Sequence, residues 1–152
     1  MPEKKEHADL RKIITNWVKS NFDVYNLKLI EDSPRNPLGY GVPPIGGCFP
    51  DLYGRSSEFG IEVIGEAKTS GDIFKEHTEI QFCKYLNHLS VFNENGYLIV
   101  AVPLQDKEEM ANFIRKIVRE RDLDILTNIF IIDDIFSNQI CGTECSIIKN
   151  SI

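Results

Sequence analysis

The 152-residue chain has few of the features that mark a specialised class of protein. Its four cysteines include no C-x-x-C pair, and the spacing of Cys141 and Cys145 lies outside the common zinc patterns. We therefore expect reduced thiols, with Cys83 packed as a small hydrophobic residue. The histidines are scattered and form no ligand pattern: His7, His77 and His88.

Long hydrophobic runs are also missing. No apolar segment is long enough to span a membrane, and the first ten residues lack the apolar core of a secretory signal. We therefore expect a cytoplasmic protein without a membrane partner. An apolar fraction of 42% and a charged fraction of 26% are ordinary for globular proteins. The length then predicts one domain over residues 1–152.

The chain has no excess of positive charge, since its formal net charge is −6. This balance argues against easy nucleic-acid binding, because most proteins that contact phosphates present a basic surface. A site built from carboxylates would itself add negative charge that metal ions later cancel. Basic residues cluster near the start of the chain and again over 115–121. For the later cluster, a solvated helix face is the simpler interpretation.

Hydrophobic periodicity predicts an α/β fold. Helical spacing is found over 3–20, 73–92 and 107–121, with Ile80, Leu86 and Leu89 expected to face inward from the second helix. Strands are expected over 23–30, at 51–53, and over 59–65, 96–103 and 129–132, with an edge strand around 145–148. Residues 54–58 suit a hairpin connection. The order predicts a three-layer sandwich with a mixed central sheet, an α-β-β-β-α-β core plus an extra helix and strand.

Two acidic residues and a lysine stand at the ends of neighbouring predicted strands. Asp51 begins one strand, and Glu66, Ala67 and Lys68 end the next. Because side chains alternate along a strand, Glu66 and Lys68 share one face while Ala67 turns into the packing. If the two strands pair, Asp51 and Glu66 converge with Lys68 beside them. Taken alone, Glu66-Ala67-Lys68 is more commonly a solvated strand end, and Pro50-Asp51 is more commonly an ordinary turn.

These residue types suit metal-dependent hydrolysis of phosphodiesters. Mg²⁺ prefers oxygen ligands and usually takes one or two protein carboxylates, which Asp51 and Glu66 could supply. The backbone carbonyl of Ala67 could add a third oxygen, and Mn²⁺ could substitute for Mg²⁺. A bound metal lowers the pKa of its water and neutralises charge on the phosphate. Lys68 would orient the water or stabilise the developing charge.

The pair Pro50-Asp51 followed by Glu66-Ala67-Lys68 resembles the signature of the PD-(D/E)xK nuclease superfamily. This superfamily includes restriction endonucleases, archaeal Holliday junction resolvases and RecB-type nuclease domains. A helix then carries Gln81 and Tyr85, similar to the Q-x-x-x-Y element of RecB-like members. The resemblance is close over 45–103, and it implies a restriction-endonuclease-like fold.

The resemblance also implies roles for further residues. Gln81 would act at the active site by positioning metal, water or DNA, and Tyr85 would support it from the same helical face. The first helix of such proteins often adds an acid to the metal site, for which Glu6 and Asp9 are both available. The alternative for both is the ordinary enrichment of acids in a first helical turn.

The segment 31–50 is the least regular part of the chain, with four prolines and four glycines over 31–47. It runs directly into Asp51, so we expect it to lie over the site. Arg35 and Tyr40 could then contact phosphate or stack on a base. A flexible loop without such contacts is an equally good interpretation.

The sequence therefore predicts a metal-dependent nuclease that hydrolyses DNA, either as a homodimer or with a partner protein. A second interpretation is an inactive nuclease-like binding or structural subunit, which the acidic surface favours. The intact set of Asp51, Glu66 and Lys68 argues against that interpretation. A cysteine-based enzyme has little support, because no histidine is placed to activate a thiol.

Overall fold

A computed structural model describes residues 5–32, 41–123 and 126–135 and the backbone of 146–147. The elements follow the predicted order. They are α1 (Lys5–Asn21), β1 (Lys28–Glu31), β2 (Leu52–Ser56), β3 (Ile61–Ala67), α2 (Glu76–Leu89), β4 (Gly96–Val102), α3 (Lys107–Glu120), β5 (Asn128–Asp133) and β6 (Ser146–Ile147). Four residues named in the sequence analysis lie outside the described residues: Arg35, Tyr40, Cys141 and Cys145.

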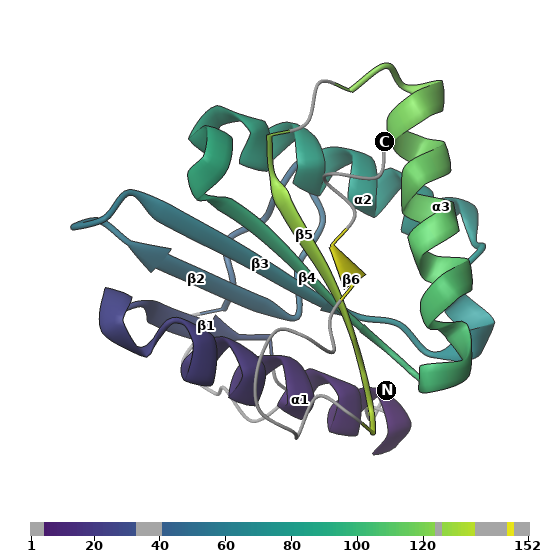
Figure 1. Cartoon of the computed structure of the whole chain (residues 1–152), viewed down its shortest axis with the longest axis horizontal. Helices are drawn as coiled ribbons and strands as arrows, with labels where there is room; N and C mark the ends of the chain where they lie inside the picture. The colour runs from purple at the N-terminus through teal and green to yellow at the C-terminus, as the bar shows by residue number, and fades with distance from the viewer. Residues whose placement is uncertain (1–4, 33–40, 124–125, 136–145, 148–152) are drawn as a thin grey trace.

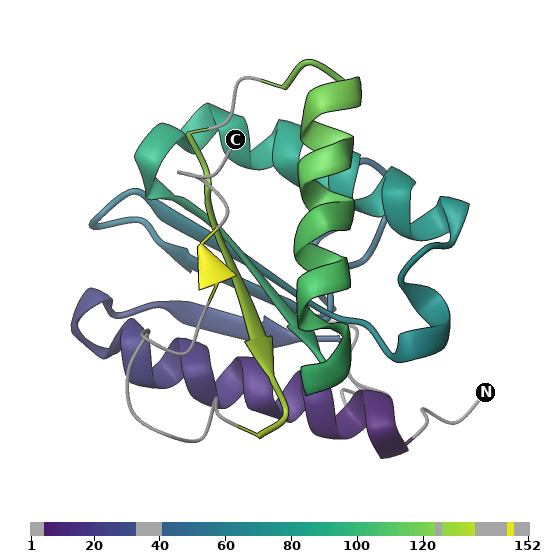
Figure 2. The same ribbon diagram turned by 45° about the vertical axis from the view of Figure 1, so that its right-hand side comes forward.

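The strands form one mixed sheet in the order β1-β2-β3-β4-β5-β6. Strand β2 pairs antiparallel with both β1 and β3, the strands β3, β4 and β5 are parallel, and β6 pairs antiparallel with β5. Helix α1 covers one face of the sheet, and α2 and α3 cover the other (Figures 1 and 2). The fold is therefore a three-layer α/β sandwich, as the sequence predicts.

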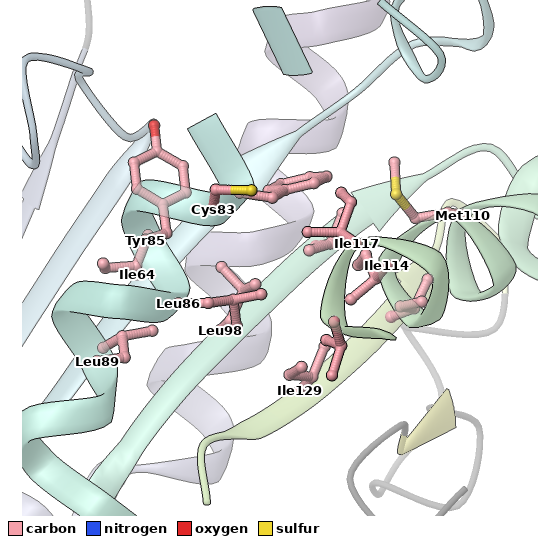
Figure 3. Packing of buried hydrophobic residues seen from close by; sticks show 14 of the residues in the cluster. Ile64, Cys83, Tyr85, Leu86, Leu89, Leu98, Met110, Ile114, Ile117 and Ile129 are labelled. Carbon is pink, nitrogen blue, oxygen red and sulfur yellow. The ribbon is translucent and has the colours of Figure 1, made fainter. Parts of the chain in front are cut away.

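Alternation along β3 assigns its side chains to the two layers. Val63 and Ala67 belong to the apolar cluster under α1, whereas Ile64 belongs to the cluster under α2 and α3. Figure 3 shows the second cluster, in which Ile64, Leu86, Leu98 and Ile129 pack between the sheet and the two helices. All seven residues of β3 are buried, so any polar side chain on this strand requires a partner.

A glycine in β3 lets α1 approach the sheet closely. A Cβ atom on Gly65 would lie 2.6 Å from Cγ2 of Ile14 in α1. This contact is closer than a real Cβ tolerates, so a larger residue would push the helix outward. The close approach matters because the first turn of α1 lies near the start of β2, where Asp51 stands.

Several predicted boundaries are wrong in detail. The hairpin does not begin at Gly54, because β2 continues through Arg55 and Ser56 in register with β3. Gly54 sits under Leu29 of β1, where its missing side chain leaves room. The turn is instead centred on residues 57–60, and Gly60 has the positive φ of 65° that such a turn needs. Residues 23–25 form a 3₁₀ helix before β1 rather than part of a strand.

The inward face of α2 also differs from the expectation. Ile80 is 38% exposed, and Gln81 occupies the inward position beside it with only 6% exposure. The predicted inward positions of Leu86 and Leu89 are confirmed, and Cys83 packs in the apolar cluster. In the described part of the chain, no helix has the length and apolar character that crossing a membrane requires.

Candidate active site

The candidate site forms at the edge of the sheet where β3 ends and β2 begins. Because the two strands are antiparallel, Leu52 pairs with Gly65, and the residues just beyond this pair are Asp51 and Glu66. The structure therefore brings together the two carboxylates that the sequence separates by a hairpin. Both are buried, with exposures of 7% for Asp51 and 4% for Glu66.

Asp51 is fixed by contacts through one of its two oxygens. Its Oδ2 accepts a hydrogen bond of 2.8 Å from the backbone N–H of Ala67. The same oxygen lies 3.2 Å from Nε2 of His7. Within the described residues, these contacts leave Oδ1 of Asp51 available for a further ligand.

Glu66 sits beneath α2, where Tyr85 donates a hydrogen bond of 3.2 Å to its Oε2. The Tyr85 hydroxyl points away from Leu86 and Leu89 of the same helix (Figure 3). Burial raises the pKa of Glu66 to about 8, and the neighbouring Asp51 carboxylate adds to the increase. The Lys68 ammonium and the Tyr85 hydroxyl oppose it. Burial and the Glu66 carboxylate in turn raise the pKa of Tyr85, which keeps its hydroxyl a donor.

Lys68 links the strand to the helix. Its Nζ donates a hydrogen bond of 2.6 Å to Oε1 of Gln81 and lies 3.4 Å from Oε1 of Glu66. Its exposure of 8% is low for a lysine. The surface position that is the common alternative for Gln81 is therefore wrong, because this side chain is buried to meet the lysine.

The short connection from β3 to α2 positions Gln81 above Lys68. In this connection Thr69 donates a hydrogen bond of 2.9 Å to Oδ2 of Asp72, and Thr78 of α2 donates one of 2.6 Å to the Asp72 carbonyl. The hydrogen bond from Lys75 is the main reason that the pKa of Asp72 is lowered. These contacts tie the first turn of α2 to the end of β3.

Helix α1 contacts the site through His7, which is not among the site residues predicted from the sequence. Glu6 and Asp9, the acids considered for this role, are both exposed on α1. A signal for His7 was present in the sequence, because it precedes the buried residues Leu10 and Ile14 by three and seven positions. That spacing places it on the inward face of the helix.

The residues fit a divalent cation of the Mg²⁺ type. In residues 5–32, 41–123 and 126–135, no group of three or more histidine, cysteine, aspartate and glutamate side chains is placed to hold a metal ion. Mg²⁺ does not need such a group, since it commonly takes one or two carboxylates and keeps several waters. Asp51 and Glu66 are two buried acidic side chains, and the Lys68 ammonium lies 3.4 Å from Glu66 and 2.6 Å from Gln81. Burial raises the pKa of Glu66 and repulsion from Asp51 adds to the increase; a cation would offset both.

Replacing Tyr85 with phenylalanine tests the support that α2 gives to Glu66. The variant keeps the ring and removes the donor to Oε2, so the pKa of Glu66 should rise further, which would weaken the binding of Mg²⁺ at pH 7 if Glu66 is a metal ligand. A lost hydrogen bond of this kind costs about 1 kcal/mol of stability. Calorimetric titration with Mg²⁺ measures the affinity, and Tyr97→Phe, on the α1 side of the sheet, is the control. Equal affinities in both variants would contradict this role.

Comparisons with known proteins do not assign this chain to a family. No family model matches the sequence, and no curated protein matches it. The structure is similar to an XisH family protein from Nostoc punctiforme, with a TM-score of 0.47 and 18% identity over 85% of this chain and 94% of that one. It is also similar to an fdxN element excision controlling factor protein from Anabaena variabilis, with a TM-score of 0.42 and 20% identity over 83% of this chain and 94% of that one. At these levels of similarity we draw nothing about function from either protein.

Proposed function

We propose that the protein is a metal-dependent nuclease that hydrolyses DNA phosphodiester bonds. One observation carries this proposal: Asp51, Glu66 and Lys68 meet in a buried cluster at one edge of the sheet. Burial of this many ionisable groups is costly unless they are paired, neutralised or used. Structural pairing explains only part of the cluster: Lys68 lies beside Glu66 and His7 beside Asp51, yet repulsion from Asp51 still adds to the raised pKa of Glu66.

In this proposal Asp51, Glu66 and the Ala67 carbonyl would hold Mg²⁺ or Mn²⁺. When bound, the ion would lower the pKa of a water molecule and neutralise charge on the scissile phosphate. The Ala67 N–H and His7 hold the Asp51 carboxylate in one orientation. Tyr85 does the same for Glu66 from the opposite layer.

Lys68 supplies the positive charge that the transition state needs. Its ammonium group is a compact donor held by Gln81 at 2.6 Å, so it is oriented before a substrate arrives. A preorganised charge in a site shielded from water is worth far more than the same charge in bulk water. Lys68 therefore orients the attacking water or stabilises the negative charge that develops on the phosphate.

The experiment is a cleavage assay with the full-length protein. Labelled linear duplex, supercoiled, single-stranded and branched DNA are each incubated with Mg²⁺, Mn²⁺ or EDTA. We expect cleavage of at least one substrate with either metal and none with EDTA. Absence of cleavage from every substrate, together with no metal binding, would favour the inactive binding subunit, an interpretation that the net charge of −6 also supports.

Phe49 is placed to contact the substrate. It stands two residues before Asp51 with an exposure of 56%, and no other described aromatic ring pairs with it. An exposed ring beside the site offers a stacking surface for a base, worth about 1–3 kcal/mol. We expect Phe49→Ala to raise the KM for DNA roughly 5- to 150-fold.

The matched control for this variant is Phe59→Ala. Phe59 is also exposed, at 45%, but it stands in the hairpin turn at the opposite end of β2 and β3, against Tyr25. Steady-state cleavage kinetics measure both variants. If Phe59→Ala raised the KM as much as Phe49→Ala does, the contact between Phe49 and DNA would be ruled out.

A further inference from the structure

Polar contacts between β3 and α2 extend beyond the candidate site. Two side chains of β3 and that of Lys68, which directly follows it, contact three side chains on one face of α2, each through a hydrogen bond. From the site outward, the pairs are Lys68 with Gln81, Glu66 with Tyr85, and Glu62 with His88. The third pair lies outside the site and has no part in the proposed chemistry.

Glu62 is a carboxylate inside the sheet, with an exposure of 1%. One oxygen accepts a hydrogen bond from the Tyr53 hydroxyl of β2, and the other contacts Nε2 of His88. Burial and the neighbouring Glu62 carboxylate together raise the pKa of Tyr53 to about 12. The side chain of His88 is 36% exposed, so the pair joins a side chain in the core to one at the surface.

A buried acid of this kind is an expensive way to obtain stability. Well-packed apolar residues of similar volume commonly stabilise a core as well as or better than a buried ion pair. What a buried polar pair adds is a directional contact, which favours one packing arrangement of two elements over slightly shifted arrangements. The Glu62–His88 pair is therefore better explained by the position of α2 than by the stability of the fold.

The spacing of the contacts shows how that position is fixed. From Glu62 to Lys68 an extended strand covers about 20 Å, whereas from Gln81 to His88 a helix rises only about 10 Å. In each of the two end pairs, the side chain from the strand and the side chain from the helix must therefore lean toward each other to make contact. A shift of α2 along β3 in either direction lengthens one end contact, so the two end pairs together hold the helix in register.

We propose that Glu62 and His88 are positioning residues for the candidate active site. The pair holds α2 in register on β3, and it thereby keeps Gln81 on Lys68 and Tyr85 on Glu66. The effect on cleavage rests on the proposed function, whereas the effect on the Lys68–Gln81 contact does not. Loss of the pair is expected to lower kcat roughly 10- to 100-fold with little change in KM, because misplaced groups lose mainly the chemical step.

The test compares His88→Ala with His77→Ala in the full-length protein. His77 is an exposed residue in the first turn of the same helix, so it controls for loss of an imidazole from α2. The readout is the side-chain amide resonance of Gln81 in a ¹⁵N–¹H correlation spectrum, identified by its loss in Gln81→Ala. Its position in Lys68→Ala shows what the resonance becomes when the hydrogen bond is broken. Residue 88 is about 10 Å from Gln81 along the helix, too far for a direct effect.

The expected result is that His88→Ala moves the Gln81 resonance toward its position in Lys68→Ala, whereas His77→Ala leaves it in place. His88→Gln, which restores a donor to Glu62, returns the resonance to the wild-type position, and Glu62→Gln provides a second disruption from the other side of the pair. An unmoved resonance in both His88→Ala and Glu62→Gln overturns the positioning role, even if the enzyme cleaves DNA. If the resonance moves but the wild-type protein cleaves nothing, the positioning role stands and the nuclease proposal fails.

Discussion

Replacement of Lys68 with alanine is expected to lower the rate of metal-dependent cleavage by roughly 10²- to 10³-fold, the usual cost of one preorganised charge in an active site. The physical reason is that Lys68 is buried and already held by Gln81, so its charge is oriented before the reaction begins. Because its ammonium also lowers the pKa of Glu66, the rates are compared at saturating Mg²⁺.

Lys75→Ala is the control for this variant. Lys75 is an exposed lysine between β3 and α2 that pairs with Asp72 at 2.6 Å, outside the carboxylate cluster. Single-turnover cleavage is measured for both variants beside the wild-type protein. A Lys68→Ala enzyme as fast as Lys75→Ala would show that the ammonium has no part in the reaction.

The second large effect is a dependence of stability on pH and metal. Burial and Asp51 raise the pKa of Glu66 from its ordinary value of 4.5 to about 8 in the folded protein. The folded state therefore holds a proton that the unfolded state has released over this interval. The contribution of Glu66 to stability is complete below about pH 4.5 and is lost as the pH rises through about 8. The metal-free protein should lose on the order of a few kcal/mol between these limits.

In the proposed site Mg²⁺ would reverse this loss, because it would bind the carboxylate form of Glu66 and offset the repulsion from Asp51. Stabilisation by Mg²⁺ should therefore be larger at pH 8 than at pH 6. Urea unfolding with EDTA or Mg²⁺ at the two pH values measures it. Glu66→Gln should flatten the pH dependence in EDTA, while Glu76→Gln, an exposed residue of α2, should not. If the stability of Glu66→Gln in EDTA depended on pH as strongly as that of the wild-type protein, another group would be responsible for the pH dependence.

Much of the fold could be predicted because its elements have simple patterns. The apolar run over 96–103 predicts a strand buried on both faces, and β4 is one. The alternation of Glu66, Ala67 and Lys68 also places each side chain correctly, with Ala67 under α1 and the two charged residues toward α2. Period and hydrophobicity suffice for such assignments.

Contacts between distant residues could not be predicted in the same way. Nothing local distinguishes His88 from His77, yet only His88 meets Glu62, a contact that depends on how α2 crosses β3. His7 reaches Asp51 because Gly65 lets α1 lie close to the sheet. Glycine is typical of turns, so Gly54 predicts a hairpin turn too early in the chain. In the structure Gly54 lies within β2, where its missing side chain leaves room for Leu29. These features depend on packing between layers, which single-chain periodicity does not encode.

The most direct test of the proposed nuclease is Mg²⁺-dependent cleavage of a labelled DNA substrate by the wild-type protein and by Asp51→Asn, prepared in parallel. Asparagine preserves the shape of the side chain and removes one of the two charges that would hold the metal. We predict cleavage by the wild-type protein that EDTA abolishes and that Asp51→Asn lacks. Cleavage that persists in Asp51→Asn at the wild-type rate would contradict the assignment of the site.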